Sequence, residues 1–203
     1  MIIEVDEYKK KISGYNPKKS EDFHSQSAKI ADRDFVECLK SKKYKSVVLM
    51  AGGTASGKTE FARSYLTKRD QLVYDGTLKD FEGFKIKLEK IKRYDKSIEN
   101  IRVILIIPSD TTEALGAFLK RDRIMKLDTF FDTQIRSKMT VAQILKQTKT
   151  RVEMYISHVG PDSNKLKYTR MKLARRRNKV GDALISIAIA LDEMRKNAHI
   201  ENK

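Results

Sequence analysis

An apolar run followed at once by a glycine-rich turn places the strongest constraint on the fold of this chain. Residues 47–51 read Val-Val-Leu-Met-Ala, which is typical of a strand buried on both faces. Residues 52–59 read Gly-Gly-Thr-Ala-Ser-Gly-Lys-Thr and match the pattern of a glycine, four residues, then Gly-Lys-Ser/Thr. Helical spacing of apolar residues follows directly, at Phe61, Ala62 and Tyr65. A strand, a glycine turn and a helix in this order predict a loop that binds phosphate.

Each position of this motif has a chemical reason. Glycines let the backbone approach phosphate oxygens closely, so that successive N–H groups and the start of the helix form an anion site. The ammonium group of Lys58 can reach the β and γ phosphates, and the Thr59 hydroxyl can ligate magnesium. The motif therefore predicts ATP and Mg²⁺ as cofactors. The predicted nucleotide-binding residues are Gly52, Gly53, Thr54, Ala55, Ser56, Gly57, Lys58 and Thr59.

Strands and helices alternate along the sequence. This predicts an α/β fold with a parallel sheet and helices on both faces, of the P-loop NTPase or kinase type. We expect residues 1–160 to form a P-loop kinase-like domain with an N-terminal helix, and residues 161–203 to form a basic helical segment that packs on it or extends it. Strands are predicted at 47–51, 72–74, 102–107 and 152–156, and helices at 21–41, from 58, from 81, at 111–125, at 141–150 with caps at Thr140 and Gln143, and at 180–194.

Phosphoryl transfer needs a carboxylate near the phosphates, to hold magnesium or to accept the proton of the attacking hydroxyl. Asp75 is the preferred candidate because it ends an apolar strand before Gly76, where a parallel sheet presents ligands to its crevice. The alternative for Asp75 is an ordinary Asp-Gly turn. Asp110 is the rival carboxylate, and it suits the N-cap of a helix at least as well. Thr59 and Asp75 are the predicted metal ligands.

A basic segment between two expected helices is suited to close over a triphosphate. Arginine fits this role because its planar guanidinium group binds phosphate in two places. The alternative is an exposed and solvated helix face. The predicted catalytic residues are therefore Lys58, Asp75, Arg121, Arg123 and Arg136, and Lys126 and Lys138 belong to the same basic segment.

Charge and composition limit the class of protein without naming its partner. The chain has 203 residues, of which 40% are hydrophobic, and this excludes a wholly disordered chain. Its formal net charge is +16, and residues 165–179 contain eight basic side chains and no acidic one. This run could attract nucleic acid, acidic lipid headgroups, nucleotide or an acidic protein, and the alternative is a solvated helix face.

The remaining residue types favour an intracellular setting. A single cysteine, Cys38, cannot form an internal disulfide, and His24, His158 and His199 are too scattered to suggest a ligand cluster. No apolar run is long enough to span a membrane, and no secretion signal is visible. We therefore expect a cytoplasmic protein.

In these motifs the chain resembles the zeta-toxin-like P-loop kinases of toxin–antitoxin systems. The resemblance rests on residues 47–59, on the helix expected before them, and on Leu-Val-Tyr-Asp-Gly-Thr-Leu at 72–78, and it extends loosely over residues 20–160. It implies a kinase that moves the ATP γ-phosphoryl group onto a sugar hydroxyl of a UDP-linked amino sugar, and an antitoxin as partner.

The resemblance also implies roles for individual residues. Asp75 would be the base or the magnesium ligand, and Arg121, Arg123 or Arg136 would be the lid cations. Only 15 residues separate Thr59 from Asp75, where the family usually fits a further Asp-bearing segment that contacts the substrate. We therefore expect a remodelled acceptor site.

Three functions stay open on the sequence alone. The first is a magnesium-dependent kinase that phosphorylates a small molecule. The second is a nucleic-acid enzyme such as a polynucleotide 5′-hydroxyl kinase, which the basic run at 165–179 favours. The third is a nucleotide-binding interaction module without turnover, which docks a partner through the apolar face of 180–194. The first is preferred because the basic run has only one aromatic residue, Tyr168, and so lacks the stacking platform of a single-strand binder.

Overall fold

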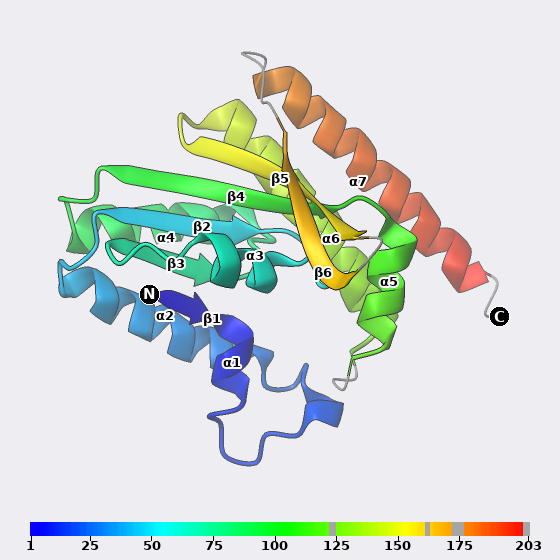
Figure 1. Ribbon diagram of the computed structural model, residues 1–203, viewed down its shortest axis with the longest axis horizontal. Coiled ribbons are helices and arrows are strands. Elements are labelled where there is room, and N and C mark those ends of the chain that lie inside the picture. The colour runs from blue at the N-terminus through cyan, green and yellow to red at the C-terminus, as the bar shows by residue number, and fades with distance from the viewer. Residues whose placement is uncertain (122–124, 161–162, 172–176, 201–203) are drawn as a thin grey trace.

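The computed structural model describes residues 1–121, 125–160, 163–171 and 177–200. Within these residues, a six-stranded sheet has the strand order β1-β3-β2-β4-β5-β6 (Figure 1). Neighbouring strands from β1 to β5 are parallel, and β6 runs antiparallel to β5. The predicted α/β class is confirmed, with a sheet that is mostly parallel. The strands are β1 (Ile2–Glu4), β2 (Ser46–Ala51), β3 (Gln71–Asp75), β4 (Asn100–Pro108), β5 (Arg151–Gly160) and β6 (Ser163–Arg170).

The helices connect these strands and follow the predicted spacing in most places. In α2, Ala31, Phe35 and Leu39 recur every four residues and are fully buried, which confirms the helix expected at 21–41. The helices of the described residues are α1 (Val5–Lys9), α2 (His24–Lys40), α3 (Lys58–Tyr65), α4 (Phe81–Tyr94), α5 (Thr111–Leu119), α6 (Leu127–Gln147) and α7 (Arg177–Ile200), with a 3₁₀ turn at Pro17–Lys19. Among the described residues, no helix is both long and apolar enough to cross a bilayer.

Helices cover both faces of the sheet, as predicted, but unequally. On one face, α2, α4 and α6 pack on strand side chains such as Leu49 and Leu105 to form the larger core. On the other face, α3 packs Phe61 and Ala62 against Val48. The predicted phosphate loop lies between β2 and α3, so it is held by the buried central strand and by the smaller core.

The prediction of a helix at 141–150 is wrong in its start. Thr140, the expected cap, is buried inside α6, which already begins at Leu127. Polar side chains of Thr133 and Gln134 are buried on this helix as well. They interrupt the apolar spacing, so the sequence pattern hides the first half of the helix. The lid predicted between two helices is therefore shorter than expected, because α6 occupies most of that segment.

The prediction that residues 161–203 are helical is wrong in its first part. Ser163–Arg170 form β6, in which Tyr168 lies opposite Ser157 and Arg170 lies opposite Tyr155. The helix predicted at 180–194 is confirmed as part of α7, which packs mainly on α6. The first half of the basic run thus belongs to the sheet itself.

One arginine of the basic run stabilises the end of α6. Arg177 donates hydrogen bonds to the carbonyl oxygens of Leu145 (3.2 Å), Thr148 (3.0 Å) and Thr150 (3.0 Å). Carbonyl groups at a helix C-terminus have no partner within the helix, and a guanidinium group satisfies several at once. Arg177 therefore has a structural role. Residues 172–176 of the run lie outside the described residues.

Candidate functional site

The glycine-rich loop of residues 52–57, predicted to bind phosphate, lies at the carboxyl edge of the sheet, between β2 and α3 (Figure 1). Gly52 leaves β2 with a φ of 133°, and Gly57 precedes α3 with a φ of 83°. Both values lie in the region that favours glycine. The first N–H groups of α3 have no acceptor within the helix and carry the positive end of its dipole. The loop thus has the backbone geometry that an anion site needs.

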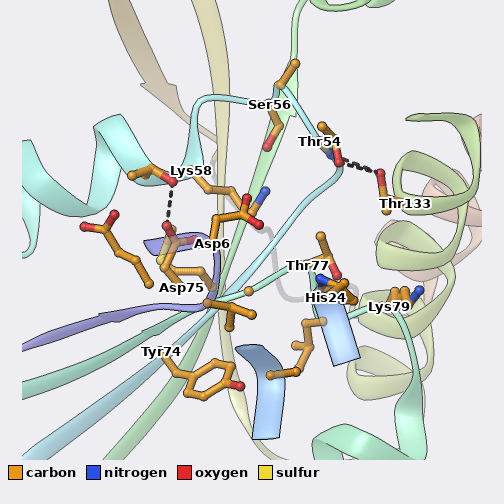
Figure 2. A pocket seen from close by; sticks show the side chains of 18 of the residues that line it. Asp6, His24, Thr54, Ser56, Lys58, Tyr74, Asp75, Thr77, Lys79 and Thr133 are labelled. Carbon is orange, nitrogen blue, oxygen red and sulfur yellow. Dashed lines mark hydrogen bonds between the residues drawn. The ribbon is translucent and has the colours of Figure 1, made fainter. Parts of the chain in front are cut away.

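The side-chain hydroxyl of Ser56 also indicates an anion site at the loop. It is buried, and its Oγ finds no hydrogen-bond partner among the residues that the structure describes. Figure 2 shows this hydroxyl directed into the cavity above Lys58 and Asp6. A buried donor without a partner costs free energy, so an acceptor such as a phosphate oxygen would stabilise this arrangement.

Lys58 projects from the first turn of α3 back under the loop. Its Nζ donates a hydrogen bond to the Gly53 carbonyl oxygen over 2.8 Å. Desolvation lowers the pKa of Lys58, while the negative charges of Asp75 and Asp6 act in the opposite direction. A bound phosphate group would supply further counter-charge to this ammonium group.

Asp75 and Thr59, the predicted metal ligands, are in direct contact. The Thr59 hydroxyl donates a hydrogen bond to Oδ2 of Asp75 over 2.6 Å. Burial raises the pKa of Asp75, and the Lys58 charge and the Thr59 hydrogen bond oppose this shift. The pair brings a hydroxyl and a carboxylate together beside Lys58, as the sequence predicted.

Thr59 and Asp75 are too few to hold a magnesium ion without further ligands. Among the described residues, no group of three His, Cys, Asp or Glu side chains could hold a metal by itself. Magnesium usually takes one or two protein ligands and completes its shell with phosphate oxygens and water, so Thr59 and Asp75 fit a magnesium–nucleotide complex better than a bare ion. Asp110 is placed differently, because its Oδ1 caps α5 by accepting from the backbone N–H groups of Thr112 (2.6 Å) and Glu113 (3.2 Å). The helix-cap alternative is correct for Asp110.

Helix α6 holds the tip of the loop. The Thr54 N–H donates to Oγ1 of Thr133 over 3.0 Å, and Nε2 of Gln134 donates to the Thr54 carbonyl oxygen over 3.0 Å. Lys138 in turn donates to Oε1 of Gln134 over 3.0 Å. Burial lowers the pKa of Lys138 to about 8, with a further contribution from the Lys58 charge. Lys138 therefore supports the loop from inside α6 and is not part of an exposed lid.

A cavity of about 570 Å³ opens beside the loop. Its walls come from the loop and α3, from β1 and α1, from the start of α2, and from the segment between β3 and α4 (Figure 2). Asp6 of α1 lines this cavity, and its charge acts on both Lys58 and Asp75. Lys9, which is only 1% exposed, forms an ion pair with Oδ1 of Asp6 over 2.9 Å and donates to the Ser20 hydroxyl over 3.2 Å.

Sequence reasoning missed Asp6, because β1 and α1 were not predicted. β1 has three residues, and its place depends on pairing with β3, where Ile3 lies opposite Tyr74 and Glu4 opposite Asp75. This pairing joins segments about seventy residues apart and leaves no local pattern. The apolar pair Ile2-Ile3 before a group of acidic residues is the only sequence signal that could have indicated it.

The predicted lid cations are not gathered at one place. Arg121 lines the cavity, and its charge contributes to the lowered pKa of Lys58. Arg136 is half exposed on α6, 3.9 Å from Oδ1 of Asp132, and does not line the cavity. Arg123 lies outside the described residues. Lys126 is exposed, and its backbone N–H donates to Glu21. Of the predicted lid arginines that the structure describes, Arg121 lines the cavity and Arg136 does not.

The backbone at Gly52 leads to a stability prediction. A Cβ atom at this position would lie 2.5 Å from the Ile106 carbonyl oxygen, and its φ is 133°. We expect Gly52→Ala to lower the free energy of unfolding by about 2 kcal/mol or more, measured by urea denaturation. Gly116→Ala is the control, since a Cβ there meets open space on α5, and it should stabilise the protein by about 0.5 to 1 kcal/mol. Equal stability of Gly52→Ala and the wild type would contradict this loop geometry.

Comparisons with known proteins add no name to this geometry. No protein-family model matches the sequence, and a search of curated proteins finds no significant match. The fold and site define an α/β protein with a glycine-rich loop at the carboxyl edge of a mostly parallel sheet. The resemblance to zeta-toxin-like kinases stays a prediction.

Proposed function

We propose that this protein has a P-loop kinase fold, binds ATP with Mg²⁺ and transfers the γ-phosphoryl group to a hydroxyl of a small molecule. The observation that carries the proposal is the contact between Thr59 and Asp75, 2.6 Å apart, beside Lys58 at the end of the loop. A glycine turn alone needs no such pair. A magnesium–nucleotide complex needs a hydroxyl at the end of the phosphate loop and a carboxylate close to it, and Thr59 and Asp75 supply these two groups.

Nucleotide binding is divided among three groups of residues. The loop N–H groups and the Ser56 hydroxyl bind the β phosphate, and Lys58 binds between the β and γ phosphates. Thr59 and Asp75 would hold magnesium, which when bound would supply counter-charge for the leaving phosphate. Arg121, which lines the cavity, would stabilise the transferred group, because guanidinium groups suit planar phosphoryl oxygens.

Asp6 is the proposed general base. The acceptor oxygen forms a bond to the γ phosphorus, the bond from this phosphorus to the β–γ bridging oxygen breaks, and the hydroxyl proton passes to Asp6. The ion pair with Lys9, 2.9 Å from Oδ1 of Asp6, orients the carboxylate. β1 and α1 thereby supply the carboxylate-bearing segment that the chain lacks between Thr59 and Asp75.

The size of the cavity supports a small acceptor. Its volume of about 570 Å³ lies within the range of ordinary ligand sites, and leaves room beside a triphosphate for a second small molecule. The acceptor side of the cavity includes His24, Thr77 and Lys79, which Figure 2 shows on the far side from Ser56. The zeta-toxin-like resemblance makes a UDP-linked amino sugar the first acceptor to test.

The test is phosphoryl transfer from ATP labelled at the γ phosphate, with Mg²⁺, to a panel of UDP-sugars, nucleosides and 5′-hydroxyl oligonucleotides. Labelling of a UDP-sugar or nucleoside supports the small-molecule kinase, and labelling of oligonucleotides alone would replace it by a polynucleotide kinase. ATP binding without labelling or hydrolysis would leave a nucleotide-binding module and overturn the proposal of turnover.

Replacement of the proposed base separates binding from transfer. We expect Asp6→Asn to lower kcat by about 100-fold or more, while the Kd for ATP changes by less than about threefold. The matched control is Glu7→Gln, since this neighbouring carboxylate also lines the cavity but forms an exposed ion pair with Lys10. Calorimetry measures the Kd for ATP. Initial rates of phosphoryl transfer, to the acceptor found in the panel above, measure kcat. Full turnover in Asp6→Asn would rule out this base.

A further inference from the structure

Three arginines from neighbouring strands gather on the face of the sheet that carries α3. Arg102 of β4 and Arg151 of β5 lie opposite each other in the strand register. Arg170 of β6 lies opposite Tyr155 of β5. Arg102 and Arg151 are near the amino ends of their strands, whereas the glycine-rich loop lies at the carboxyl edge (Figure 1). The arginines therefore form a surface away from the loop.

This surface carries more positive charge than its own contacts neutralise. All three guanidinium groups approach one carboxylate, Glu153, with N···O distances of 3.0 Å for Arg102, 3.0 Å for Arg151 and 3.7 Å for Arg170. Among the described residues, Glu153 is the one carboxylate within ion-pair distance of these arginines, and it is 4% exposed. The side chains of Arg151 and Arg170 are 57% and 60% exposed. Three cations against one carboxylate leave two positive charges facing solvent.

Aromatic side chains adjoin the arginines on the same face. The Tyr155 hydroxyl donates to Oε2 of Glu153 over 3.1 Å, and the Tyr155 ring lies 4.6 Å from the ring of Phe61 on α3, centroid to centroid. Phe61 also stacks on Tyr65, with centroids 5.0 Å apart. Tyr65 is the last residue of α3 and is 59% exposed. A continuous row of contacts thus joins an exposed tyrosine to the arginines.

The fold brings together residues that no single segment contains. The basic run at 165–179 has one aromatic residue, Tyr168, which by itself is too little for a stacking platform. Strand pairing places Arg170 of this run beside β5, and the packing of α3 places the ring of Tyr65 5.6 Å from that of Tyr168. Arginine and exposed aromatic side chains are therefore combined only in the folded chain.

We propose that this surface binds single-stranded nucleic acid, with phosphates at Arg151 and Arg170 and a base on Tyr65. The planar guanidinium group suits phosphate oxygens, and an exposed aromatic ring stacks on a base of any sequence. An acidic peptide would use the arginines but would gain no stacking from Tyr65, so the exposed tyrosine favours nucleic acid. We call this the arginine–tyrosine surface, and its residues are Tyr65, Arg102, Arg151, Tyr155 and Arg170.

The arginine–tyrosine surface is independent of the proposed kinase site. None of its five residues lines the cavity beside the glycine-rich loop. Binding of nucleic acid there needs neither ATP nor magnesium on the loop. We therefore expect Lys58→Ala to bind an oligonucleotide with a Kd within about twofold of the wild-type value, as a change outside the surface should.

The first test measures the Kd for a fluorescently labelled single strand of about twelve nucleotides, as DNA and as RNA, while the salt concentration is raised. We expect the double variant Arg151→Gln/Arg170→Gln to raise this Kd at least about tenfold at low salt. The slope of log K against log salt should become shallower by about 1.4, which corresponds to two lost phosphate contacts on a single strand. The matched control is Lys29→Gln/Arg33→Gln, which removes two exposed charges from α2 on the opposite face, and its Kd should change less than about threefold.

Tyr65 provides a second variant with a different signature. Tyr65→Ala should raise the Kd about tenfold, the scale of one stacked base, and should leave the salt slope unchanged because it removes no charge. Tyr65→Phe keeps the ring and should bind within about twofold of the wild type. Circular dichroism verifies that each variant is folded, and polyglutamate serves as a competing polyanion without bases.

These measurements support or overturn the arginine–tyrosine surface directly. A shallower salt slope in the arginine variant, together with weaker binding in Tyr65→Ala at an unchanged slope, supports it. Absence of oligonucleotide binding to the wild type at low salt, or wild-type affinity in the folded arginine variant, would overturn it. Binding that does not depend on Tyr65 and is displaced equally well by polyglutamate would overturn it in favour of an acidic protein partner.

Discussion

Replacing Lys58 by alanine is expected to lower magnesium-dependent ATP turnover at least about 1,000-fold, because one preorganised cation at the transferred phosphate is worth about this much. Its Nζ already lies 2.8 Å from the loop carbonyl oxygen of Gly53, and since desolvation lowers its pKa, a bound phosphate would favour its charged ammonium form. The effect should appear in both kcat and nucleotide affinity, since Lys58 contacts the phosphates before and during transfer. Initial rates and calorimetric binding of Mg-ATP measure the two parts.

An exposed lysine of the same region provides the control. Lys68 follows α3 and does not line the cavity, so Lys68→Ala should retain turnover within about twofold, as expected for a surface change. Circular dichroism would verify that both variants are folded. A folded Lys58→Ala protein with wild-type turnover would refute the assignment of the loop as the phosphate site.

Replacing Asp75 by asparagine is expected to lower turnover at least about 100-fold and to raise the Mg²⁺ concentration needed for half-maximal rate. Asparagine keeps the size of the side chain and can still accept the hydrogen bond from Thr59. The loss therefore comes from the missing negative charge. A magnesium titration of the ATPase or transfer rate measures it.

The same variant is expected to keep or gain stability. Burial raises the pKa of Asp75 in the folded protein, so the folded state binds this proton more tightly than the unfolded state does. Stability from this group is thus present at low pH and is lost as pH rises from the ordinary carboxyl range through the raised pKa. Asp75→Asn should remove this pH dependence, and its Tm at pH 7 should be no lower than that of the wild type.

Asp70→Asn is the matched control at the opposite end of β3. Asp70 is exposed and lies just before the first residue of the strand, away from the cavity. It should change neither turnover nor the pH dependence of Tm. Asp75→Asn that is as active as Asp70→Asn would show that Asp75 holds no magnesium.

Local patterns predicted the part of the site that one continuous segment builds. The loop from Gly52 to Thr59 needs only the strand before it and the helix after it, and both are marked by their own apolar spacing. Asp75 was predicted for a similar reason, because a residue that ends a parallel strand lies at the carboxyl edge wherever the strand sits in the sheet. Its partner Thr59 was predicted from the motif.

Sequence patterns did not predict the parts of the site where segments far apart in the chain meet. The strand β1 is too short to be seen in sequence, and only its pairing with β3 brings Asp6 and Lys9 to the cavity. Polar side chains of α6 are buried because they bind the loop, and so the helix start was misplaced. The β5–β6 hairpin was hidden by its lysines, which alternate with Leu166 and Tyr168.

The sequence by itself determined the α/β class and predicted a phosphate loop with Lys58, Thr59 and Asp75 at its end. These follow from short-range regularities: the spacing of apolar side chains, the freedom of glycine, and the fixed direction of parallel strands. The tertiary structure alone decided that Asp6 faces the loop, that Arg121 but not Arg136 lines the cavity, and that Arg170 of the basic run meets Arg102 and Arg151 at one carboxylate. These placements depend on strand pairing and helix packing between residues far apart in the chain, which no local pattern records.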